Sequence, residues 1–280
     1  MAVQIITDST SELTGDLAET WNVQVLPLLV FFGNECYRDG LDLSSKEFFR
    51  KIKESADLPT TSQVTPAQFA EVFRAHREAG REVVGIFISS KLSGTYNSAV
   101  LARESLGDKG VYVIDSRTAT FCLGAIVIEA ARLAKSGRSG AEIADWVRRV
   151  AATHMMYGVI DSLDHLRRGG RLSLKSAIVG NILGVKPVIT IRDGEVIMLA
   201  KARGHKNALR WMLEDAEKNG LSARSGKTVY FAYSLDKSSL EALQEMIMQK
   251  YGKREFIELE VGAVVGTHIG PGAIGFCVVE

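Results

Sequence analysis

Short apolar segments that alternate with helix-forming segments place the strongest constraint on how this chain can fold. Residues 4–7, 82–88 and 110–114 are rich in Val and Ile, and each segment is followed by polar residues. Stretches with helical character come later, including residues 98–106 and 119–135. This alternation is typical of a mainly parallel sheet that helices cover on both faces. The sequence therefore predicts an α/β fold.

The second half of the chain carries elements of its own. Asp193-Gly194 lies between two apolar segments and predicts a two-residue hairpin turn. Further helices are expected over residues 174–182, 206–219 and 238–251, and further strands over residues 228–233, 256–261 and 274–279. Because the composition changes near residue 160, we expect two α/β domains, residues 1–160 and 161–280, with the ligand site between them.

Three segments have less regular patterns. Residues 23–32 are strongly apolar and predict one long strand, which turns at Gly33-Asn34 into a hairpin. Residues 60–63 are polar, so we expect a loop there, just ahead of a helix that Pro66 opens. Residues 262–275 are rich in glycine, and we expect a loop before the final strand.

A hydroxyl-rich turn is the first candidate site. Ser or Thr occupies five of the eleven positions from Ser89 to Ala99, between a predicted strand and a predicted helix. In an open α/β sheet this turn lies at the carboxyl end of a strand, where ligands bind. The free N–H groups of the new helix and its positive dipole end favour an anion. We therefore interpret Ser93, Gly94 and Thr95 as part of an anion site, although Ser and Thr residues also serve as simple helix caps.

Two other segments carry candidate polar residues. Thr61 and Ser62 form a second hydroxyl-rich stretch before a helix, and His268 stands between glycines that would leave its imidazole open to a ligand. A histidine in such a segment is about as often a turn residue. Arg167, Arg168 and Arg171 are most simply explained as charges that complement a helix dipole.

The charge balance argues against strongly electrostatic partners. Lys plus Arg total 34 and Asp plus Glu total 33, which gives no basis for binding nucleic acid. Cys36, Cys122 and Cys277 are far apart in apolar surroundings, so we expect small buried side chains and neither disulfides nor a metal site. No apolar run reaches the roughly 20 residues of a membrane span and no signal-peptide pattern occurs, so we expect a cytoplasmic protein.

An enzymatic alternative combines Ser93, His268 and an acid such as Asp115 in a serine-type acyl hydrolase. The residues around Ser93 lack both flanking glycines of the G-x-S-x-G motif. The chain also lacks the glycine-rich loops that bind nucleotides. We assign no catalytic residue, no metal and no cofactor, and keep the hydrolase as the alternative.

Taken in order, these segments resemble the DegV family, which includes the fatty-acid-binding subunits of bacterial fatty acid kinase. The resemblance rests on Asp8-Ser9-Thr10, Thr61-Ser62-Gln63, residues 90–99, Asp115-Ser116, residues 169–173, Lys186-Pro187, Ala202-Arg203 and residues 266–272. These motifs span nearly the whole chain. Two positions depart from the family pattern: Val64 stands where proline is usual, and Lys91 where glycine is frequent. Neither departure removes a hydroxyl or the histidine.

The resemblance implies a non-catalytic, two-domain α/β protein that encloses one long-chain fatty acid as its ligand. The residues implied near the carboxylate are Thr61, Ser62, Ser93, Gly94, Thr95 and His268, with Arg171 and Arg203 at the carboxylate entrance or facing a partner. That partner would be a separate ATP-dependent fatty acid kinase subunit, which makes an acyl phosphate for bacterial phospholipid synthesis. Transient contact with a membrane is compatible with this role.

The free energies expected from burial and from hydrogen bonds differ between the two ends of such a ligand. About fourteen methylene groups at roughly 0.8 kcal/mol each give on the order of 11 kcal/mol of gross burial free energy. One or two hydroxyl hydrogen bonds contribute about 1 kcal/mol each. We therefore expect the tail to supply affinity and the polar residues to supply orientation.

Overall fold

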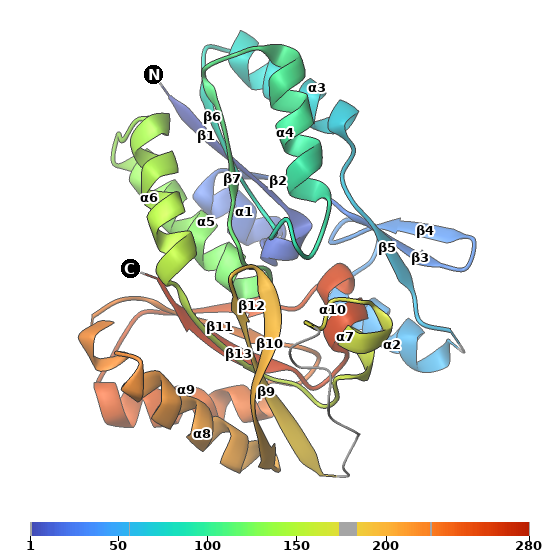
Figure 1. Cartoon of the computed structure of the whole chain (residues 1–280), viewed down its shortest axis with the longest axis vertical. Coiled ribbons are helices and arrows are strands. Elements are labelled where there is room, and N and C mark those ends of the chain that lie inside the picture. Colours follow the sequence, from blue (N-terminus) through green and yellow to red (C-terminus); the bar gives the residue numbers. More distant parts are fainter. Residues whose placement is uncertain (1, 56, 174–183, 225, 280) are drawn as a thin grey trace.

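The computed structural model describes residues 2–55, 57–173, 184–224 and 226–279. Its upper half in Figure 1 is built on a four-stranded parallel sheet in the order β2-β1-β6-β7. The strands are β1 (Val3–Asp8), β2 (Val23–Leu26), β6 (Glu82–Phe87) and β7 (Val111–Asp115). The predicted α/β fold with a parallel sheet is thus confirmed.

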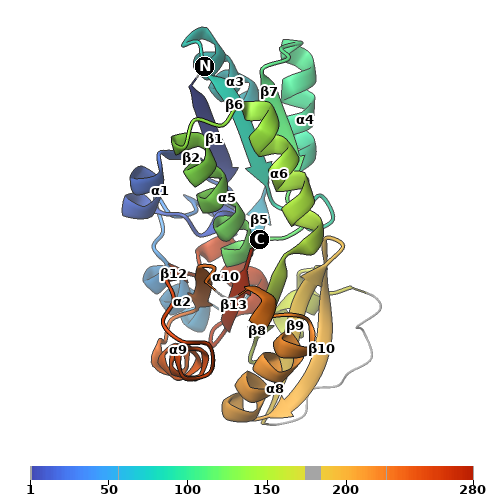
Figure 2. The same cartoon turned by 90° about the vertical axis from the view of Figure 1, so that its left-hand side faces the viewer.

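Helices cover both faces of this sheet, as Figure 2 shows from the side. One face carries α3 (Pro66–Glu78) and α4 (Thr95–Leu106), and the other carries α5 (Thr120–Lys135), α6 (Gly140–Thr153) and α1 (Gly15–Trp21). The start of α3 follows from its sequence, because the Thr65 hydroxyl accepts a hydrogen bond from the Gln68 N–H and Pro66 occupies the first turn. The start of α4 lies three residues before the predicted Ser98.

The lower half of the molecule contains a six-stranded sheet in the order β10-β9-β8-β13-β11-β12, antiparallel except for the β11–β12 pair. Its strands are β8 (Met155–Val159), β9 (Val185–Arg192), β10 (Glu195–Arg203), β11 (Val229–Tyr233), β12 (Phe256–Glu260) and β13 (Ile274–Val278). One face packs on α8 (His205–Lys218) and α9 (Ser238–Tyr251), and the other receives α5 from the first half. The hairpin turn at Asp193-Gly194 is confirmed. The helix predicted at residues 174–182 lies outside the described residues.

The division of the chain at residues 160 and 161 stays a prediction. β8 lies before that position in the sequence and pairs with β13 and β9 of the six-stranded sheet. Two 3-10 helices occur among the described residues, η1 (Ser9–Ser11) and η3 (Ser222–Arg224). None of the helices within the described residues is both long and apolar enough to cross a membrane.

A small antiparallel sheet, in the order β4-β3-β5, projects from the side of the molecule (Figure 1). It consists of β3 (Leu29–Phe32), β4 (Glu35–Arg38) and β5 (Thr60–Ser62), with α2 (Ser45–Glu54), α7 (Asp164–Arg168) and α10 (Ala263–Ile269) close by. Because β4 is an edge strand, its Cys36 is exposed, and the prediction that all three cysteines are buried is wrong for this one. Cys122 and Cys277 are buried as expected.

The prediction of one strand over residues 23–32 is also wrong. The segment divides at Pro27 into β2 and β3, which belong to different sheets. Proline has no N–H to donate to a strand partner, and the next N–H, that of Leu28, donates to the Ser9 hydroxyl at 3.1 Å. The chain therefore leaves the parallel sheet and starts the small one.

Two segments that we expected to be loops are regular structure. Residues 60–62 form β5, in which Thr61 pairs with Val30 of β3, as β-branched residues favour. Within the glycine-rich segment, residues 263–269 form α10, so His268 lies on a helix. Gly266 faces α2, where an added Cβ would come within 2.6 Å of the Phe48 ring. Here glycine serves close helix packing.

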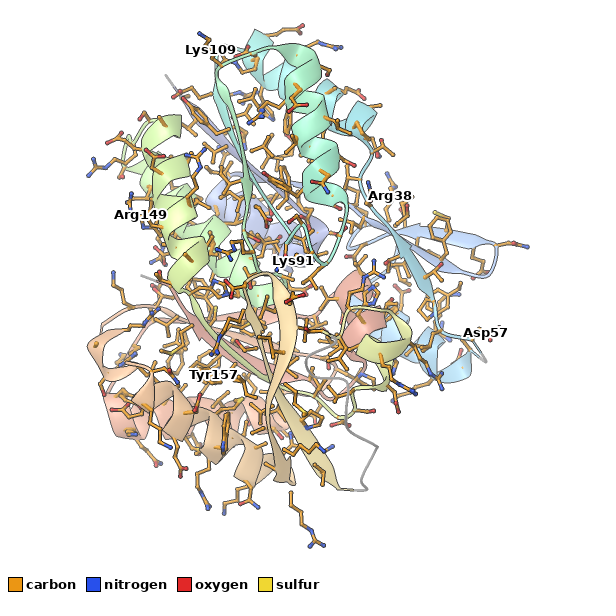
Figure 3. The ribbon with its side chains drawn as sticks, viewed as in Figure 1. Arg38, Asp57, Lys91, Lys109, Arg149 and Tyr157 are labelled. Carbon is orange, nitrogen blue, oxygen red and sulfur yellow. The ribbon has the colours of Figure 1, made fainter. Side chains whose placement is uncertain are left out.

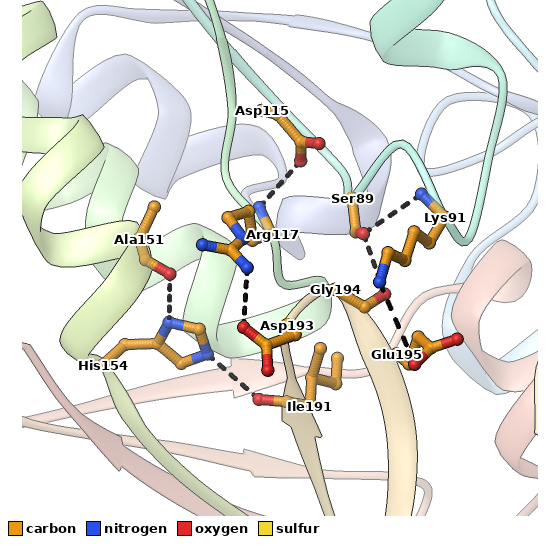
Figure 4. Close-up of polar contacts among 10 residues, drawn as sticks. All are labelled: Ser89, Lys91, Asp115, Arg117, Ala151, His154, Ile191, Asp193, Gly194 and Glu195. Atoms are coloured by element: carbon orange, nitrogen blue, oxygen red, sulfur yellow. Dashed lines mark hydrogen bonds and ion pairs between the residues drawn. The ribbon is translucent and has the colours of Figure 1, made fainter. Parts of the chain in front are cut away.

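The tip of the β9–β10 hairpin joins the two halves (Figure 4). The Ser89 hydroxyl donates to the Gly194 carbonyl at 2.8 Å, and the Arg117 guanidinium pairs with the Asp193 carboxylate at 2.6 Å. Gly194 has φ +83°, and an added Cβ would lie 2.6 Å from the Ser89 hydroxyl, so this position requires glycine. The hairpin is thereby fixed at the carboxyl ends of the parallel strands.

Candidate functional site

An apolar cavity lies where the carboxyl ends of the parallel strands meet the six-stranded sheet and α10. Its empty space is about 860 Å³, which includes open solvent at the mouth. Its apolar lining side chains are Leu28, Ile88, Leu92, Ala119, Phe121, Met156, Val159, Ile160, Leu166, Ile189, Ile191, Val196, Ala232, Val261, Val264, Val265, Ile269, Ala273 and Ile274. A lining of this kind favours a long apolar ligand.

Among the described residues, six polar side chains also line the cavity: Thr10, Thr61, Thr120, Ser93, Arg171 and His268. Two of them use their hydroxyl protons within the protein. Thr10 donates to the Asp8 carboxylate at 2.5 Å, and Thr120 donates to the Glu12 carboxylate at 2.9 Å. The side chains left to meet a ligand are therefore those of Thr61, Ser93, Arg171 and His268.

A second, polar cavity adjoins the apolar one. Thr61, Arg171 and His268 line both cavities. The outer cavity is otherwise lined by Asp57, Leu58, Pro59, Thr60, His165, Arg168, Gly169 and Thr267. Figure 3 labels Asp57 at the outer edge of this region, beside α2. The three shared side chains thus mark the boundary between an apolar interior and a polar entrance.

Thr61 and His268 contact each other at this boundary. The Thr61 hydroxyl lies 3.2 Å from Nε2 of His268. Burial, together with electrostatic repulsion from Arg171 and His165, lowers the pKa of His268 to about 4, so the imidazole is neutral at pH 7. Nδ1 is buried and has no hydrogen-bond partner among the described residues. Because a buried N–H without a partner is costly, Nε2–H donating to Thr61 is the favoured tautomer, which frees the Thr61 hydroxyl proton for a ligand.

Ser93 is fixed at the start of α4. Its hydroxyl lies 3.0 Å from the Thr95 hydroxyl and accepts from the Thr95 N–H at 3.3 Å. Thr95 itself is fully buried and does not line the cavity. Gly94 packs against Gln63, because an added Cβ would lie 2.0 Å from the amide oxygen of that side chain, whose amide nitrogen donates to Ser98 at 2.7 Å. Of the three residues predicted in this turn, Ser93 alone faces the cavity.

Arg171 connects two segments at the boundary of the cavities and places a positive charge there. Its Nε donates to the Leu92 carbonyl at 3.1 Å, and Nη1 donates to the Gly169 carbonyl at 2.6 Å. These bonds connect the segment after α7 with the turn before α4. No carboxylate of the described residues forms an ion pair with Arg171, so its charge suits an anionic ligand.

Two predicted site residues lie elsewhere. Ser62 follows Thr61 on β5, and its side chain is exposed and lines neither cavity, as the alternation of side chains along a strand requires. Arg203 is exposed at the end of β10 and lines neither cavity. The motifs that contain Ser62 and Arg203 do not indicate in which direction these two side chains point.

Sequence reasoning missed a pair of buried acids that position α10. Glu12 accepts from the Gly262 N–H at 2.7 Å, and Asp39 accepts from the Ala263 N–H at 2.9 Å. Burial raises the pKa of Asp39 to about 6, and burial and the neighbouring Asp39 raise the pKa of Glu12 well above its usual value. Both acids lie more than 200 residues from α10 in sequence, so no local pattern indicates the contact.

The outer cavity also contains residues that the sequence did not single out as ligand contacts, among them His165 and Thr267. The His165 ring contacts the Thr267 carbonyl at 3.2 Å. Arg168, which we explained by the helix dipole, lines this cavity and is exposed. The nearby Arg167 and Arg171 were the sequence signal that could have indicated a ligand contact at Arg168.

The geometry gives the hydrolase alternative little support. The imidazole of His268 contacts Thr61, and the Ser93 hydroxyl contacts Thr95. Asp115 accepts from the N–H groups of Ser90 and Arg117, and no hydrogen bond between Asp115 and His268 occurs in the described part of the chain. A triad requires a base that bonds the nucleophile and an acid that orients the base. No group of three or more His, Cys, Asp or Glu side chains that could hold a metal occurs among the described residues.

The fold and the cavity together define an α/β protein with an enclosed apolar site and a polar mouth. The chain belongs to the DegV family, a family of uncharacterised proteins whose model matches residues 2–280. It is 37% identical over 273 residues to a DegV domain-containing protein of Caldanaerobacter subterraneus, covering 98% of this chain and 97% of the relative.

Two solved structures are similar to this chain over nearly its whole length. A DegV family protein from Thermus thermophilus, described for its fatty acid binding, has a TM-score of 0.91 and 35% identity, with 100% of both chains covered. A stearic acid-binding protein from Eubacterium ventriosum has a TM-score of 0.90 and 28% identity, covering 99% of this chain and 98% of that one.

Proposed function

We propose that this protein binds one long-chain fatty acid, with the acyl tail in the apolar cavity and the carboxylate at Thr61, Ser93, Arg171 and His268. One observation carries the proposal. Thr61, Arg171 and His268 line both the apolar cavity and the outer cavity, and none of the three is bonded to a buried carboxylate of the described residues. An amphiphile with one anionic end matches this arrangement. The fatty acids bound by similar proteins support the same ligand class.

We further propose that the protein presents this carboxylate to a separate ATP-dependent kinase subunit, which converts it to an acyl phosphate. Phosphoryl transfer depends on positioning and charge stabilisation, and a carboxylate at the boundary of the two cavities is reachable from the outer one. The chain lacks the nucleotide-binding loops that a kinase of its own would need. Arg168 and the exposed Arg203 are the basic residues we assign to the partner-facing surface, with phospholipid synthesis as the use of the product.

A titration tests the binding step separately from the kinase step. Delipidated protein should bind a long-chain fatty acid with submicromolar affinity, and the methyl ester of the same acid should bind at least tenfold more weakly because it cannot pair with Arg171. Equal affinity for acid and ester would contradict the proposed seat of the carboxylate. In the presence of the kinase subunit and ATP, acyl phosphate should form only when this protein is present.

A further inference from the structure

Among the described residues, the apolar cavity and another polar cavity share two lining side chains. Met156 on β8 and Ile191 on β9 line the apolar cavity and also line this polar cavity, which we call the far cavity. Both residues are 5% exposed. The polar cavity is also lined by Arg117, His154 and Asp193, which Figure 4 shows around the carbonyl of Ile191.

Neither of these two side chains lines the outer polar cavity at the mouth. The cavity follows β8, from Met156 past Gly158 to Ile160, and the chain then enters α7 and reaches Arg171 at the mouth. The four residue steps from Met156 to Ile160 span about 13 Å in extended conformation. A fatty acid whose carboxylate lies at the mouth would therefore direct its methyl end towards Met156 and Ile191.

The backbone that carries the two side chains is held in place. The Thr190 hydroxyl donates to the Met156 carbonyl at 2.7 Å, and Nε2 of His154 lies 3.3 Å from the Ile191 carbonyl. Beyond them, the Arg117–Asp193 ion pair at 2.6 Å gives the far cavity a charged wall. A methyl end gains free energy by leaving water for apolar surroundings, and it gains little against charged groups.

We propose that Met156 and Ile191 form an apolar plug that sets the longest acyl chain the protein accepts. This inference rests on the proposed function, because it takes the ligand to be a fatty acid in the orientation given above. Alanine at position 156 lacks the three heavy atoms of methionine beyond Cβ. Since packed interiors tolerate exchanges that conserve volume best, the space should be refilled by about two further methylene groups of the ligand.

The test is the affinity of delipidated protein for a series of saturated fatty acids of increasing length, measured by displacement of a fluorescent fatty acid. Met156→Ala and Ile191→Ala should each move the preferred length upward by about two methylene groups and strengthen binding of the longest acids about tenfold. The matched control is Met155→Ala, since Met155 is equally buried on the same strand but lines only the far cavity. Its length preference should equal that of the wild type.

Ile191→Val keeps the test decisive if the alanine variants do not fold. It removes a single methylene group, a change that cores tolerate, and should shift the preference in the same direction by a smaller amount. Folded plug variants with the wild-type length preference would overturn the plug, and so would an equal shift in Met155→Ala. Failure of the wild-type protein to bind any fatty acid would instead contradict the proposed function on which the plug rests.

Discussion

The hydroxyl of Thr61 lies 3.2 Å from Nε2 of His268, although 207 residues separate the two in the sequence. The contact joins β5 of the small sheet to α10, and it lies where the apolar cavity meets the outer polar one. We therefore expect this pair to meet the ligand carboxylate.

Thr61→Val should weaken fatty acid binding about fivefold, because it removes one hydrogen bond worth about 1 kcal/mol while keeping the shape of the side chain. The measurement is a binding titration with the acid and its methyl ester. Ser62→Ala is the matched control, since Ser62 is exposed and lines neither cavity. An equal loss in Ser62→Ala, or no loss in Thr61→Val, would count against this seat.

Ser93→Ala should reduce acyl-phosphate formation by tenfold or more, since the hydroxyl faces the cavity at the helix start. The variant should cost only about 1 kcal/mol of unfolding free energy, because Ser93 also accepts the Thr95 N–H. Ser90→Ala, in the same turn but outside the cavity lining, should retain full turnover. Kinase-coupled assays and chemical denaturation measure the two effects. Full turnover in Ser93→Ala would remove the residue from the proposed mechanism.

Arg171 and Arg168 should behave differently. Arg171 lines both cavities, so Arg171→Ala should weaken acid binding and should reduce the kinase step still more. Arg168 lines the outer cavity alone, so Arg168→Ala should leave acid binding unchanged and lower turnover with the kinase. Binding titrations and kinase assays on both variants check this. Lost lipid binding in Arg168→Ala with normal turnover would contradict the assignment.

The imidazole of His268 should titrate with a pKa of about 4 in the lipid-free protein, and fatty acid binding should raise this pKa because the carboxylate stabilises the imidazolium. The folded-state pKa lies below the ordinary value of 6.5. The neutral ring therefore contributes stability above pH 6.5, on the order of 3 kcal/mol, which is lost as the pH falls towards 4. NMR of the ring protons measures the pKa in the lipid-free and lipid-bound protein. His268→Asn should reduce the loss of unfolding free energy between pH 6.5 and pH 4. A free-state pKa near 6.5 would be inconsistent with the buried, neutral ring.

Asp39→Asn should raise the free energy of unfolding at pH 8. Burial raises the pKa of Asp39 from 3.8 to about 6 in the folded state, so its favourable contribution is present below pH 3.8 and is lost as the pH rises through 6. Asparagine can still accept from the Ala263 N–H and carries no charge beside Glu12. Denaturation at pH 8 and pH 4 checks this, and the gain should shrink at pH 4. Destabilisation at pH 8 would show that the charged form is required.

The parts of the fold that depend on local patterns were predictable. Thr65, Pro66 and Gln68 define the start of α3 within four residues of sequence, and Asp193-Gly194 defines a hairpin turn. The alternation of apolar strands and helices sufficed for the parallel sheet. In each case the energetic preference is local.

The failures have a common physical origin in contacts between distant segments. Residues 263–269 are flanked by glycines, yet they form a helix whose first N–H groups are accepted by Glu12 and Asp39. Thr60 and Thr61 form a strand because β3 supplies a partner. Local propensity is a weak predictor wherever tertiary contacts satisfy the backbone.

The candidate site was predictable only in part, because short motifs identify residues but do not give the directions of their side chains. Thr61, Ser93 and His268 were identified from short motifs and Arg171 from the family resemblance, and all four line the apolar cavity. Side-chain direction was not predictable: Ser62 points away from the cavity, and Thr95 is buried behind Ser93. The outer cavity depends on how α7 packs against α10, which no single segment encodes.

Native mass spectrometry of the freshly purified protein tests the central claim most directly. The account predicts one long-chain fatty acid per chain, lost on organic extraction and regained when the acid is added back. Protein that carries no fatty acid and takes up none when it is supplied would contradict the account.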